Sequence, residues 1–499
     1  PTRGAALRRG WLCNLVGGTA ALYWLSMPVH NVGGLPWLLA VPCALLIAAC
    51  IASAGGLFAL AAHALRHRPP YIWAVMLGLL WYVLEEVYAL ALGFPWLELS
   101  GALAAWPLLV QAADTVGAYG LSGIWVMAAL WCGLAFLPHP LAGTAGAAPG
   151  KPGKATPTSQ AGKRPWRPAC LVCGLLTAGL LLGYGALRLH QQPLEVAPTG
   201  PQSVQALFVE GNVDQNQKWL PAFQRQIVDL YLSLTYDALA QRPGERPLII
   251  WPETALPFFF ETNLLHSPRV KQLPAVTGSP LLVGAPGLEP RAGKKVPDIF
   301  NRAFLLTPPN GAIAAHYDKE HLVPFGEYLP EWLNFGFLEA LLQGVGVYQT
   351  GTAIAPLRYD NLALGMLICY EGIFPWLAQA RVENGANILV DISNDGWFGA
   401  TPAPRQHLYL TALRALEQNR WILRGTNTGI SAVVDSRGRL TMRGIQFREQ
   451  ALWGRAALES APSLYHKLWP WPLPVAVALL IGLFLWAPAG KARHKAVAP

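Results

Sequence analysis

Three residue types that can do chemistry together follow apolar runs in the second half of the chain. Glu253 stands in "LIIWPETALP" (248–257), Lys319 in "YDKEHLVPFGEYLP" (317–330) and Cys369 in "LICYEGIFP" (367–375). Burying a lone charge costs several kcal/mol, so charges next to apolar strands are normally paired. In a shared site, the lysine would lower the thiol pKa and stabilise an oxyanion, and the glutamate would carry the thiol proton.

Cysteine usage singles out Cys369, the only cysteine between residues 190 and 499. By composition alone it is either a nucleophile or a small buried apolar side chain. The other cysteines lie in or at the edge of apolar runs, and we interpret them as small apolar side chains. Cys170 and Cys173 have the spacing of metal ligands, but no second Cys/His pair accompanies them, so we expect no metal site. The cysteines other than Cys369 are Cys13, Cys43, Cys50, Cys132, Cys170 and Cys173.

Short β-branched runs lead into these residues, and helical patterns separate some of them. Alternating strand and helix segments with apolar strands predict an α/β or layered α+β domain over 200–462, its sheets covered by helices. Catalytic groups of such folds lie where strands end. The expected strands are 203–209, 247–251, 280–285, 303–307, 362–369, 387–393, 421–426 and 430–435, and the expected helices are 221–240, 375–384 and 404–420.

The rest of the chain has the composition of a membrane protein. Hydrophobic residues make up 53% of the 499 residues and charged residues only 13%, against about 25% in soluble proteins. Six apolar runs approach the roughly 20 residues that a membrane helix needs. They lie near 11–28, 35–62, 71–92, 108–137, 169–189 and 468–488.

Basic residues flank these runs on alternate sides. The N-terminus, the loop at 66–70, the linker and the C-terminal tail are basic, whereas 30–36 and 94–101 carry no Lys or Arg. The positive-inside rule therefore places both termini in the cytoplasm and the 190–467 block outside, which in a bacterium is the periplasm. The net charge of +9 forms no patch with interleaved aromatics, so we expect no nucleic-acid partner.

The predicted organisation has six parts. They are N-terminal membrane helices (1–137), a basic disordered cytoplasmic linker (138–168), a membrane helix (169–189), the catalytic domain (200–462), a C-terminal membrane helix (468–488) and a basic cytoplasmic tail (489–499).

Glu85 and Glu86 lie inside a predicted span, where they either pack between helices or contact a lipid head group.

Several motifs resemble a known family. "WPETALP", "DKEHLVPFGEYLP" and "ICYEGIFP" resemble the Glu–Lys–Cys triad segments of the nitrilase superfamily. Together with the spans, "VEGNVDQNQKW", "ISNDGWFG", "RALEQNRWILRGTNTGISAVVDSRG", "GFPWLELS" and "GAYGLSG", they make nearly the whole chain similar to the apolipoprotein N-acyltransferase family. That family usually has eight spans. We count six and expect that the first two are absent, in keeping with a chain that begins at Pro1.

The resemblance implies a fold and a reaction. The catalytic domain would be a nitrilase-like α-β-β-α sandwich outside the membrane. Cys369 would be the nucleophile, Glu253 the general base and Lys319 the third triad member. A fatty acyl chain would pass from a glycerophospholipid of the bilayer, through a cysteine thioester, to the N-terminal amine of a diacylglyceryl-cysteine on an apolipoprotein. No cofactor and no metal would be needed.

The resemblance also assigns supporting roles. Glu327 would hold Lys319 or Glu253, Tyr370 and Glu371 would shape the thioester pocket, and Trp219 would gate acyl-chain entry. Each also has an ordinary interpretation, as a loop charge or a core aromatic. Two other functions compete at this stage. One is a membrane-tethered amidase using the same triad, which the spans disfavour; the other is a non-catalytic lipoprotein-binding scaffold, which the intact triad disfavours.

Overall fold

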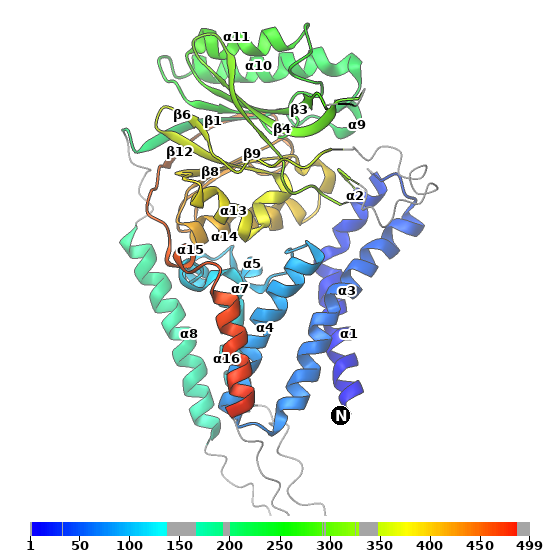
Figure 1. Cartoon of the computed structure of the whole chain (residues 1–499), viewed down its shortest axis with the longest axis vertical. Coiled ribbons are helices and arrows are strands. Elements are labelled where there is room, and N and C mark those ends of the chain that lie inside the picture. The colour runs from blue at the N-terminus through cyan, green and yellow to red at the C-terminus, as the bar shows by residue number, and fades with distance from the viewer. Residues whose placement is uncertain are drawn as a thin grey trace, which may run out of the picture.

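The structure, a computed structural model, describes residues 2–486 apart from 32, 137–165, 193–199, 292, 294–295, 325 and 329–347. It has a helical part and an α/β domain stacked on one end of the helices (Figure 1). Nearly all of the predicted linker and the whole predicted tail lie outside the described residues. Their predicted disorder therefore stays a prediction.

The helical part confirms a multi-pass membrane protein. Five described segments are long and apolar enough to span a bilayer. Large apolar side chains such as Leu38, Leu180 and Leu485 are exposed on the helices, as is expected of a surface that faces lipid tails. The segments are 3–31, containing α1 (Arg3–Leu22) and α2 (Ser26–Asn31), 37–67, containing α3 (Trp37–Ala64), and the single helices α4 (Pro70–Leu92), α7 (Ala113–Phe136) and α8 (Trp166–Gln191).

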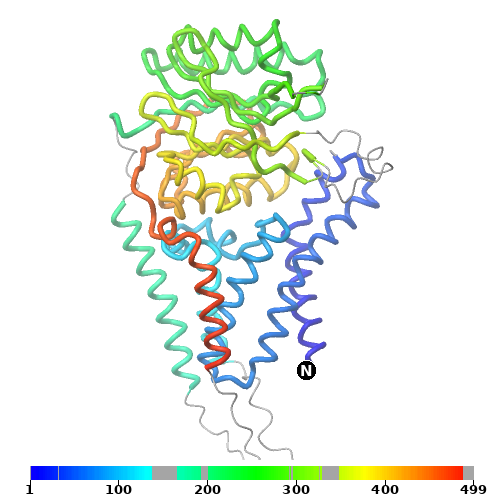
Figure 2. The backbone as a smooth tube through the Cα atoms, viewed as in Figure 1, coloured from blue at the N-terminus to red at the C-terminus, as the bar shows by residue number. Residues whose placement is uncertain are grey.

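Two predicted spans differ in detail. The predicted run at 108–137 is divided, because α6 (Pro107–Val110) ends before α7 begins, and Gly117 bends α7 with a φ of 74°. The last predicted span is present as α16 (Pro472–Trp486), whose 15 described residues fall short of the other spans. Although it is last in sequence, α16 packs against α4, and both run beneath the α/β domain (Figure 2).

The α/β domain contains two mixed six-stranded sheets. The first has the order β12-β1-β2-β3-β4-β5 and the second β11-β10-β9-β8-β7-β6. Each has a parallel centre, β1-β2-β3 and β7-β8-β9, with antiparallel strands outside it. The strands are β1 (Ser203–Glu210), β2 (Leu248–Ile250), β3 (Leu281–Glu289), β4 (Asp298–Thr307), β5 (Ala312–Asp318), β6 (Leu357–Tyr359), β7 (Leu362–Ile368), β8 (Ile388–Ser393), β9 (Ile422–Thr426), β10 (Ala432–Val434), β11 (Leu440–Arg443) and β12 (Gln450–Ala457).

The layers run helix, sheet, sheet, helix, as the resemblance implied. One apolar core joins the facing sides of the two sheets, for example Phe208 and Ile250 with Leu364 and Val390. A second core joins the first sheet to α10 (Gln224–Ala240) and α11 (Ser267–Thr277). A third joins the second sheet to α13 (Pro375–Glu383) and α14 (Ala403–Gln418). The α13–α14 layer lies between the sheets and the membrane helices (Figure 1).

Candidate active site

Glu253 lies in a tight turn immediately after β2. The next residue, Thr254, has a φ of 46°, which is unusual for a β-branched side chain. The turn lies directly against Gly284 of β3, where a Cβ would come within 2.6 Å of Pro252 O and Thr254 N. The glycine therefore gives the Glu253 turn room to lie against the neighbouring strand. Glu253 itself is buried.

Cys369 lies at the corresponding end of β7, as the first residue of a 3-10 turn, η6 (Cys369–Ile373). Its φ of 56° is left-handed, a conformation that costs energy for a residue with a side chain and is often found at functional sites. The carbonyl oxygen of Cys369 accepts a hydrogen bond from His407 Nε2 at 3.0 Å, and His407 Nδ1 lies 3.0 Å from Asp395 Oδ1. A buried polar contact thus fixes the backbone that carries the sulfur.

Lys319 follows β5 and contacts the carboxylates of Glu253 and Glu327. Its backbone N–H donates to Asn301 O at 2.9 Å, and its Nζ lies 3.3 Å from Glu253 Oε1 and 2.9 Å from Glu327 Oε1. Asn301 Nδ2 donates to the same two oxygens, at 2.7 and 2.8 Å. Lys319 is only 1% exposed. The four side chains therefore form one buried network, and the predicted association of Lys319 with Glu253 and Glu327 is present.

Electrostatics link this network to Cys369. Burial raises the pKa of the Cys369 thiol well above its usual value, Glu253 raises it further, and Lys319 lowers it. For Lys319, burial lowers the pKa, but Glu327 and Glu253 outweigh burial and keep the amine charged. Lys319 thus acts on the thiol pKa in the expected direction, but burial has the larger effect. The raised pKa favours the protonated thiol in the resting site.

The two oxygens of the Glu253 carboxylate have different surroundings. Glu253 Oε1 is occupied by Lys319 and Asn301. Glu253 Oε2 is buried and accepts no hydrogen bond from any part of the chain that the structure describes. A carboxylate oxygen left free in this way can take a proton when the sulfur attacks.

Glu371 is fully buried and holds loops together. Its carboxylate accepts from Tyr317 Oη at 2.9 Å and from three backbone N–H groups, of Ile368, Glu320 and His321, at 2.7 to 2.9 Å. Burial raises its pKa to about 7. Glu371 thus links the segment after Lys319 to the turn that carries Cys369, and it supports the site by holding these two segments together.

Tyr370, Glu327 and Trp219 have different surroundings. The Tyr370 hydroxyl donates to Gly93 O, at the end of α4, at 2.5 Å. Glu327 also accepts from Val323 N–H at 2.8 Å, which anchors its own loop. Trp219 is 45% exposed, so the interpretation of Trp219 as a core aromatic does not hold.

Sequence reasoning missed several polar residues of the site. Asn301 lies within β4 and gives no signal in the sequence, because one amide inside an apolar strand has many interpretations. Lys218 lies in the motif "VEGNVDQNQKW", in which the resemblance assigns a role only to its neighbour Trp219. His407 sits on α14, where it looks like an ordinary helix residue.

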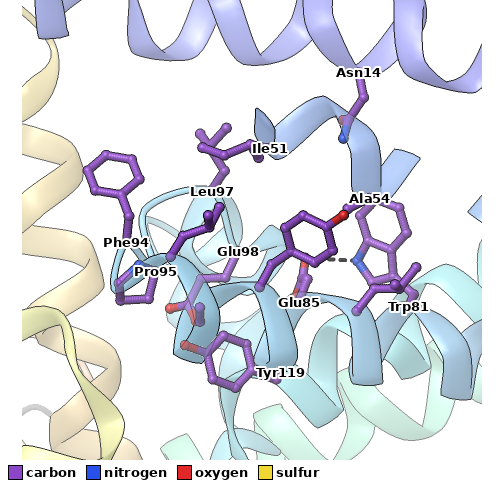
Figure 3. Close-up of a pocket in the computed structure, with 14 residues that line it drawn as sticks. Asn14, Ile51, Ala54, Trp81, Glu85, Phe94, Pro95, Leu97, Glu98 and Tyr119 are labelled. Carbon is purple, nitrogen blue, oxygen red and sulfur yellow. Dashed lines mark hydrogen bonds between the residues drawn. The ribbon is translucent and has the colours of Figure 1, made fainter. Parts of the chain in front are cut away.

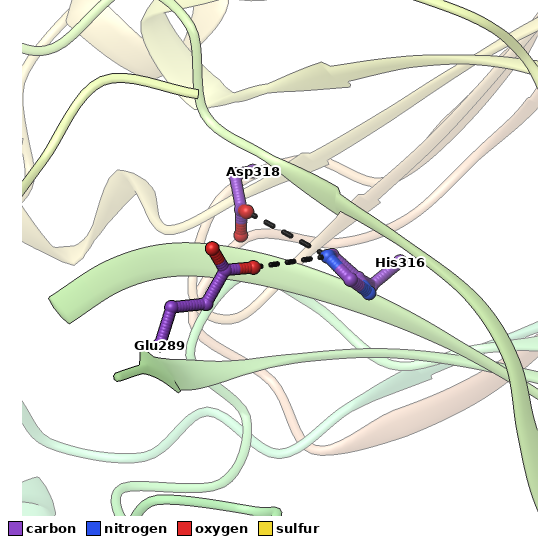
Figure 4. A group of neighbouring side chains, drawn as sticks. All are labelled: Glu289, His316 and Asp318. Atoms are coloured by element: carbon purple, nitrogen blue, oxygen red, sulfur yellow. Dashed lines mark ion pairs between the residues drawn. The ribbon is translucent and has the colours of Figure 1, made fainter. Parts of the chain in front are cut away.

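Among the described residues, one group has the composition of a metal site. Glu289, His316 and Asp318 offer ligand atoms within 4.8 Å of one another (Figure 4). Arg302 already forms ion pairs with the two carboxylates of this group, with nitrogen–oxygen distances of 2.7 Å to Glu289 and 2.6 Å to Asp318. We interpret the group as an ion-pair network at the edge of the first sheet.

A pocket lies among the membrane helices beneath the α4–α5 loop, α5 being Leu99–Leu103 (Figure 3). Residues of α1, α3 and α4 line it, and Phe94 and Glu98 belong to the loop. Glu85 Oε1 accepts from Trp81 Nε1 at 2.8 Å and from Leu99 N–H at 2.9 Å. Glu85 therefore fastens the loop to α4, which favours the helix-packing interpretation.

Comparison with protein families matches both parts of the chain. Residues 215–461 match the carbon-nitrogen hydrolase family, and residues 1–131 match the apolipoprotein N-acyltransferase N-terminal domain. The apolipoprotein N-acyltransferase of Geobacter metallireducens is 33% identical over 482 residues, 96% of this chain and 87% of that protein. The protein of that name from Pseudomonas syringae pv. tomato is 30% identical, over 97% of this chain and 88% of its own.

Solved structures match about half of the chain at lower identity. A Saccharomyces cerevisiae member of the nitrilase superfamily is 17% identical, with a TM-score of 0.40, over 53% of this chain and 93% of that one. A carbon-nitrogen hydrolase from Helicobacter pylori is 16% identical, with a TM-score of 0.38, over 51% of this chain and 89% of its own.

Proposed function

The chain belongs to the apolipoprotein N-acyltransferase family, and from this premise we propose how its own residues carry out the acyl transfer. The enzyme is a multi-pass membrane N-acyltransferase with a carbon-nitrogen hydrolase domain. Its donor is a membrane glycerophospholipid, and its acceptor is the N-terminal amine of a diacylglyceryl-cysteine on an apolipoprotein. Cys369 is the nucleophile, Glu253 the general base, and Lys319 the cation that accompanies both.

The first half-reaction acylates the cysteine. The Cys369 sulfur attacks the ester carbonyl of the phospholipid while Glu253 takes the thiol proton. Lys319, held by Glu327, stabilises the negative charge that develops on the carbonyl oxygen. The carbon–oxygen ester bond then breaks, Glu253 returns the proton to the glycerol oxygen, and a lysophospholipid leaves. A thioester remains on Cys369.

The second half-reaction transfers the acyl chain. The apolipoprotein amine attacks the thioester carbonyl, and a carbon–nitrogen bond forms as the carbon–sulfur bond breaks. Glu253 takes a proton from the amine and returns it to the sulfur, which regenerates the thiol. A buried site suits this step, because a thioester reacts readily with amines and survives where water is excluded. Cys369 and Glu253 are both buried.

The catalytic domain lies on the periplasmic face of the inner membrane in this proposal. Support comes from charge at the helix ends distant from the α/β domain (Figure 1). Arg3 begins α1, Arg66 and Arg68 lie between α3 and α4, and Arg167 is in the first turn of α8. Basic residues mark the cytoplasmic side of membrane helices. Figure 1 puts the α/β domain at the other end.

The buried Glu253–Lys319 contact, electrostatically coupled to Cys369, is the observation that carries the proposal. To test it, membranes containing the protein are incubated with a phospholipid that carries a labelled acyl chain. We expect a label on the protein band that hydroxylamine removes and that Cys369→Ala abolishes. Cys132→Ala, in a membrane helix, is the matched control and should keep the label.

Two other results would identify the competing functions. Turnover of short amides without a labelled band would mean an amidase. A wild-type protein that neither takes the label nor turns over amides would be a scaffold.

A further inference from the structure

A second lysine is buried beside the triad. Lys218 ends the short helix α9 (Gln215–Lys218) and is 1% exposed. Its Nζ donates to Thr254 Oγ1 at 2.7 Å and to Glu253 O at 3.4 Å. In the described part of the chain no carboxylate lies within ion-pair distance of this amine. A buried ammonium group with only neutral acceptors is costly, so an ordinary structural lysine would not be expected here.

The segment that carries Lys218 is firmly held. The Asp214 side chain caps α9 by accepting from Asn216 N–H at 2.8 Å. The amides of Gln215 and Asn394 bond to each other in both directions at 3.0 Å. Asn394 follows β8. The position of Lys218 is therefore set by the second sheet, although its amine contacts the turn after β2 in the first.

Lys218 and Cys369 influence each other's protonation. Burial lowers the pKa of Lys218 to about 7, while Glu253 and Cys369 raise it. The effect is reciprocal: if a thiolate favours the charged form of Lys218, the charged lysine favours the thiolate by the same free energy. The other charged groups coupled to the sulfur are Glu253, Lys319, Asp395 and Arg424.

We propose that Lys218 is a further positioning residue of this active site, which holds the turn of Glu253 and supplies a second positive charge that favours the Cys369 thiolate. Both contacts of its Nζ are to the turn in which Thr254 has a positive φ. Losing them would let the general base move away from the sulfur. The role in turnover rests on the proposed function, whereas the effect on the thiol does not.

The test compares Lys218→Met, which removes the charge and keeps the length, with Lys218→Arg, which keeps the charge. The matched control is Lys467→Met, at an exposed lysine of α15 (Leu464–Leu468). Full-length proteins in membranes are treated with iodoacetamide, and modification of the Cys369 peptide is followed by mass spectrometry. At pH 6, below the pKa of Lys218 and therefore with its amine charged, we expect Lys218→Met to slow alkylation by about ten-fold, equivalent to about one pKa unit. Lys218→Arg and Lys467→Met should stay within about two-fold of wild type.

A second variant keeps the proposal testable if Lys218→Met does not fold. Thr254→Val removes the hydroxyl that accepts from Lys218 and should slow formation of the labelled acyl-enzyme by about three- to ten-fold. Alkylation in folded Lys218→Met at the wild-type rate would overturn the proposal, as would full acylation by Thr254→Val. Because alkylation needs no lipid, slowed alkylation with an unlabelled wild type would uphold the Lys218 effect and reject the proposed function.

Discussion

At the scale of single residues, the buried charges around Lys319 are paired with one another. Lys319 lies between Glu253 and Glu327, and Asn301 donates to both carboxylates. Removing one member of such a group leaves the others uncompensated in a medium that solvates charge poorly. The network therefore fixes the geometry of the base and the charge of the lysine together.

Glu327→Gln tests that dependence. Without the Glu327 charge, Lys319 pairs with Glu253 alone, which holds that carboxylate in an ion pair and weakens it as a base. We expect acyl-enzyme formation to slow by at least about ten-fold, measured as labelled protein against time. Glu289→Gln removes an exposed carboxylate that contacts Arg302 and should leave the rate near wild type. Equal rates for both variants would mean that Glu327 is an ordinary loop charge.

The resting thiol predicts a pH dependence. Because burial and Glu253 raise the pKa of Cys369, its proton is lost only at a pH above the range of ordinary cysteines. Alkylation of Cys369 by iodoacetamide should therefore increase about ten-fold per pH unit between about pH 7 and 9. A plateau reached below about pH 7 would show instead a thiolate at rest.

The sequence pointed to the proposed triad but not to the residues that support it. Glu253, Lys319 and Cys369 stood out because charged or reactive side chains follow apolar strands in recognisable motifs, and the structure places Lys319 against Glu253 and links both electrostatically to Cys369. Asn301 and Lys218 did not stand out, since an amide within a strand and a lysine in a short helix usually face solvent. The contact of Tyr370 with Gly93 joins residues 277 positions apart, so the sequence around either residue does not indicate it.

At the scale of elements, the interior strands of both sheets were predictable and the four edge strands were not. All eight expected strands are present, because fully buried strands leave continuous apolar runs. β11 and most of β5 alternate between exposed and partly buried residues, and β6 has only three residues, so these strands leave no continuous apolar run. β12 was not expected either, because its partner β1 lies at the other end of the domain's sequence. Among the helices, α11 was not expected, because a proline lies inside it.

Gly284→Ala tests how β3 positions the base. The added Cβ would come within 2.6 Å of the backbone around Glu253, and neither strand nor turn can move freely in this core. We expect a loss of about 1–3 kcal/mol in unfolding free energy and a clear loss of acylation, measured by thermal unfolding and by labelling. Gly179→Ala, in α8 with nothing within 4 Å, is the control. Unchanged labelling in Gly284→Ala would show that the turn adapts.

At the scale of the whole molecule, the turn of Cys369 is fastened to the membrane helices. Tyr370 binds Gly93 at the end of α4. Arg414 of α14 donates to Ile373 O at 2.6 Å and pairs with Glu417 at 2.9 Å. Glu417 in turn accepts from Ala118 N–H, beside the bend of α7, at 2.8 Å. The turn that carries the proposed nucleophile is thereby held in a fixed position relative to the membrane helices.

Tyr370→Phe tests that attachment by removing one hydroxyl. The catalytic domain keeps its core, so iodoacetamide should still alkylate Cys369 within about two-fold of the wild-type rate. Acylation by membrane phospholipid should fall by about ten-fold, because the site is no longer aligned with the lipid surface. Tyr236→Phe, at an exposed tyrosine of α10, controls for the substitution itself. Parallel losses in both assays would place Tyr370 in the chemistry of the thiol instead.

The central claim is that Cys369 carries an acyl group from a phospholipid to an amine, and a chase experiment measures this directly. The wild-type protein is first acylated from a labelled phospholipid, freed of excess lipid and then given a diacylglyceryl-cysteine peptide. Mass spectrometry follows the Cys369 peptide and the acceptor. We expect the acyl mass to leave Cys369 as an equal amount of amide appears on the acceptor amine. An acyl group on another residue, or its release only as free fatty acid, would rule out transfer through Cys369.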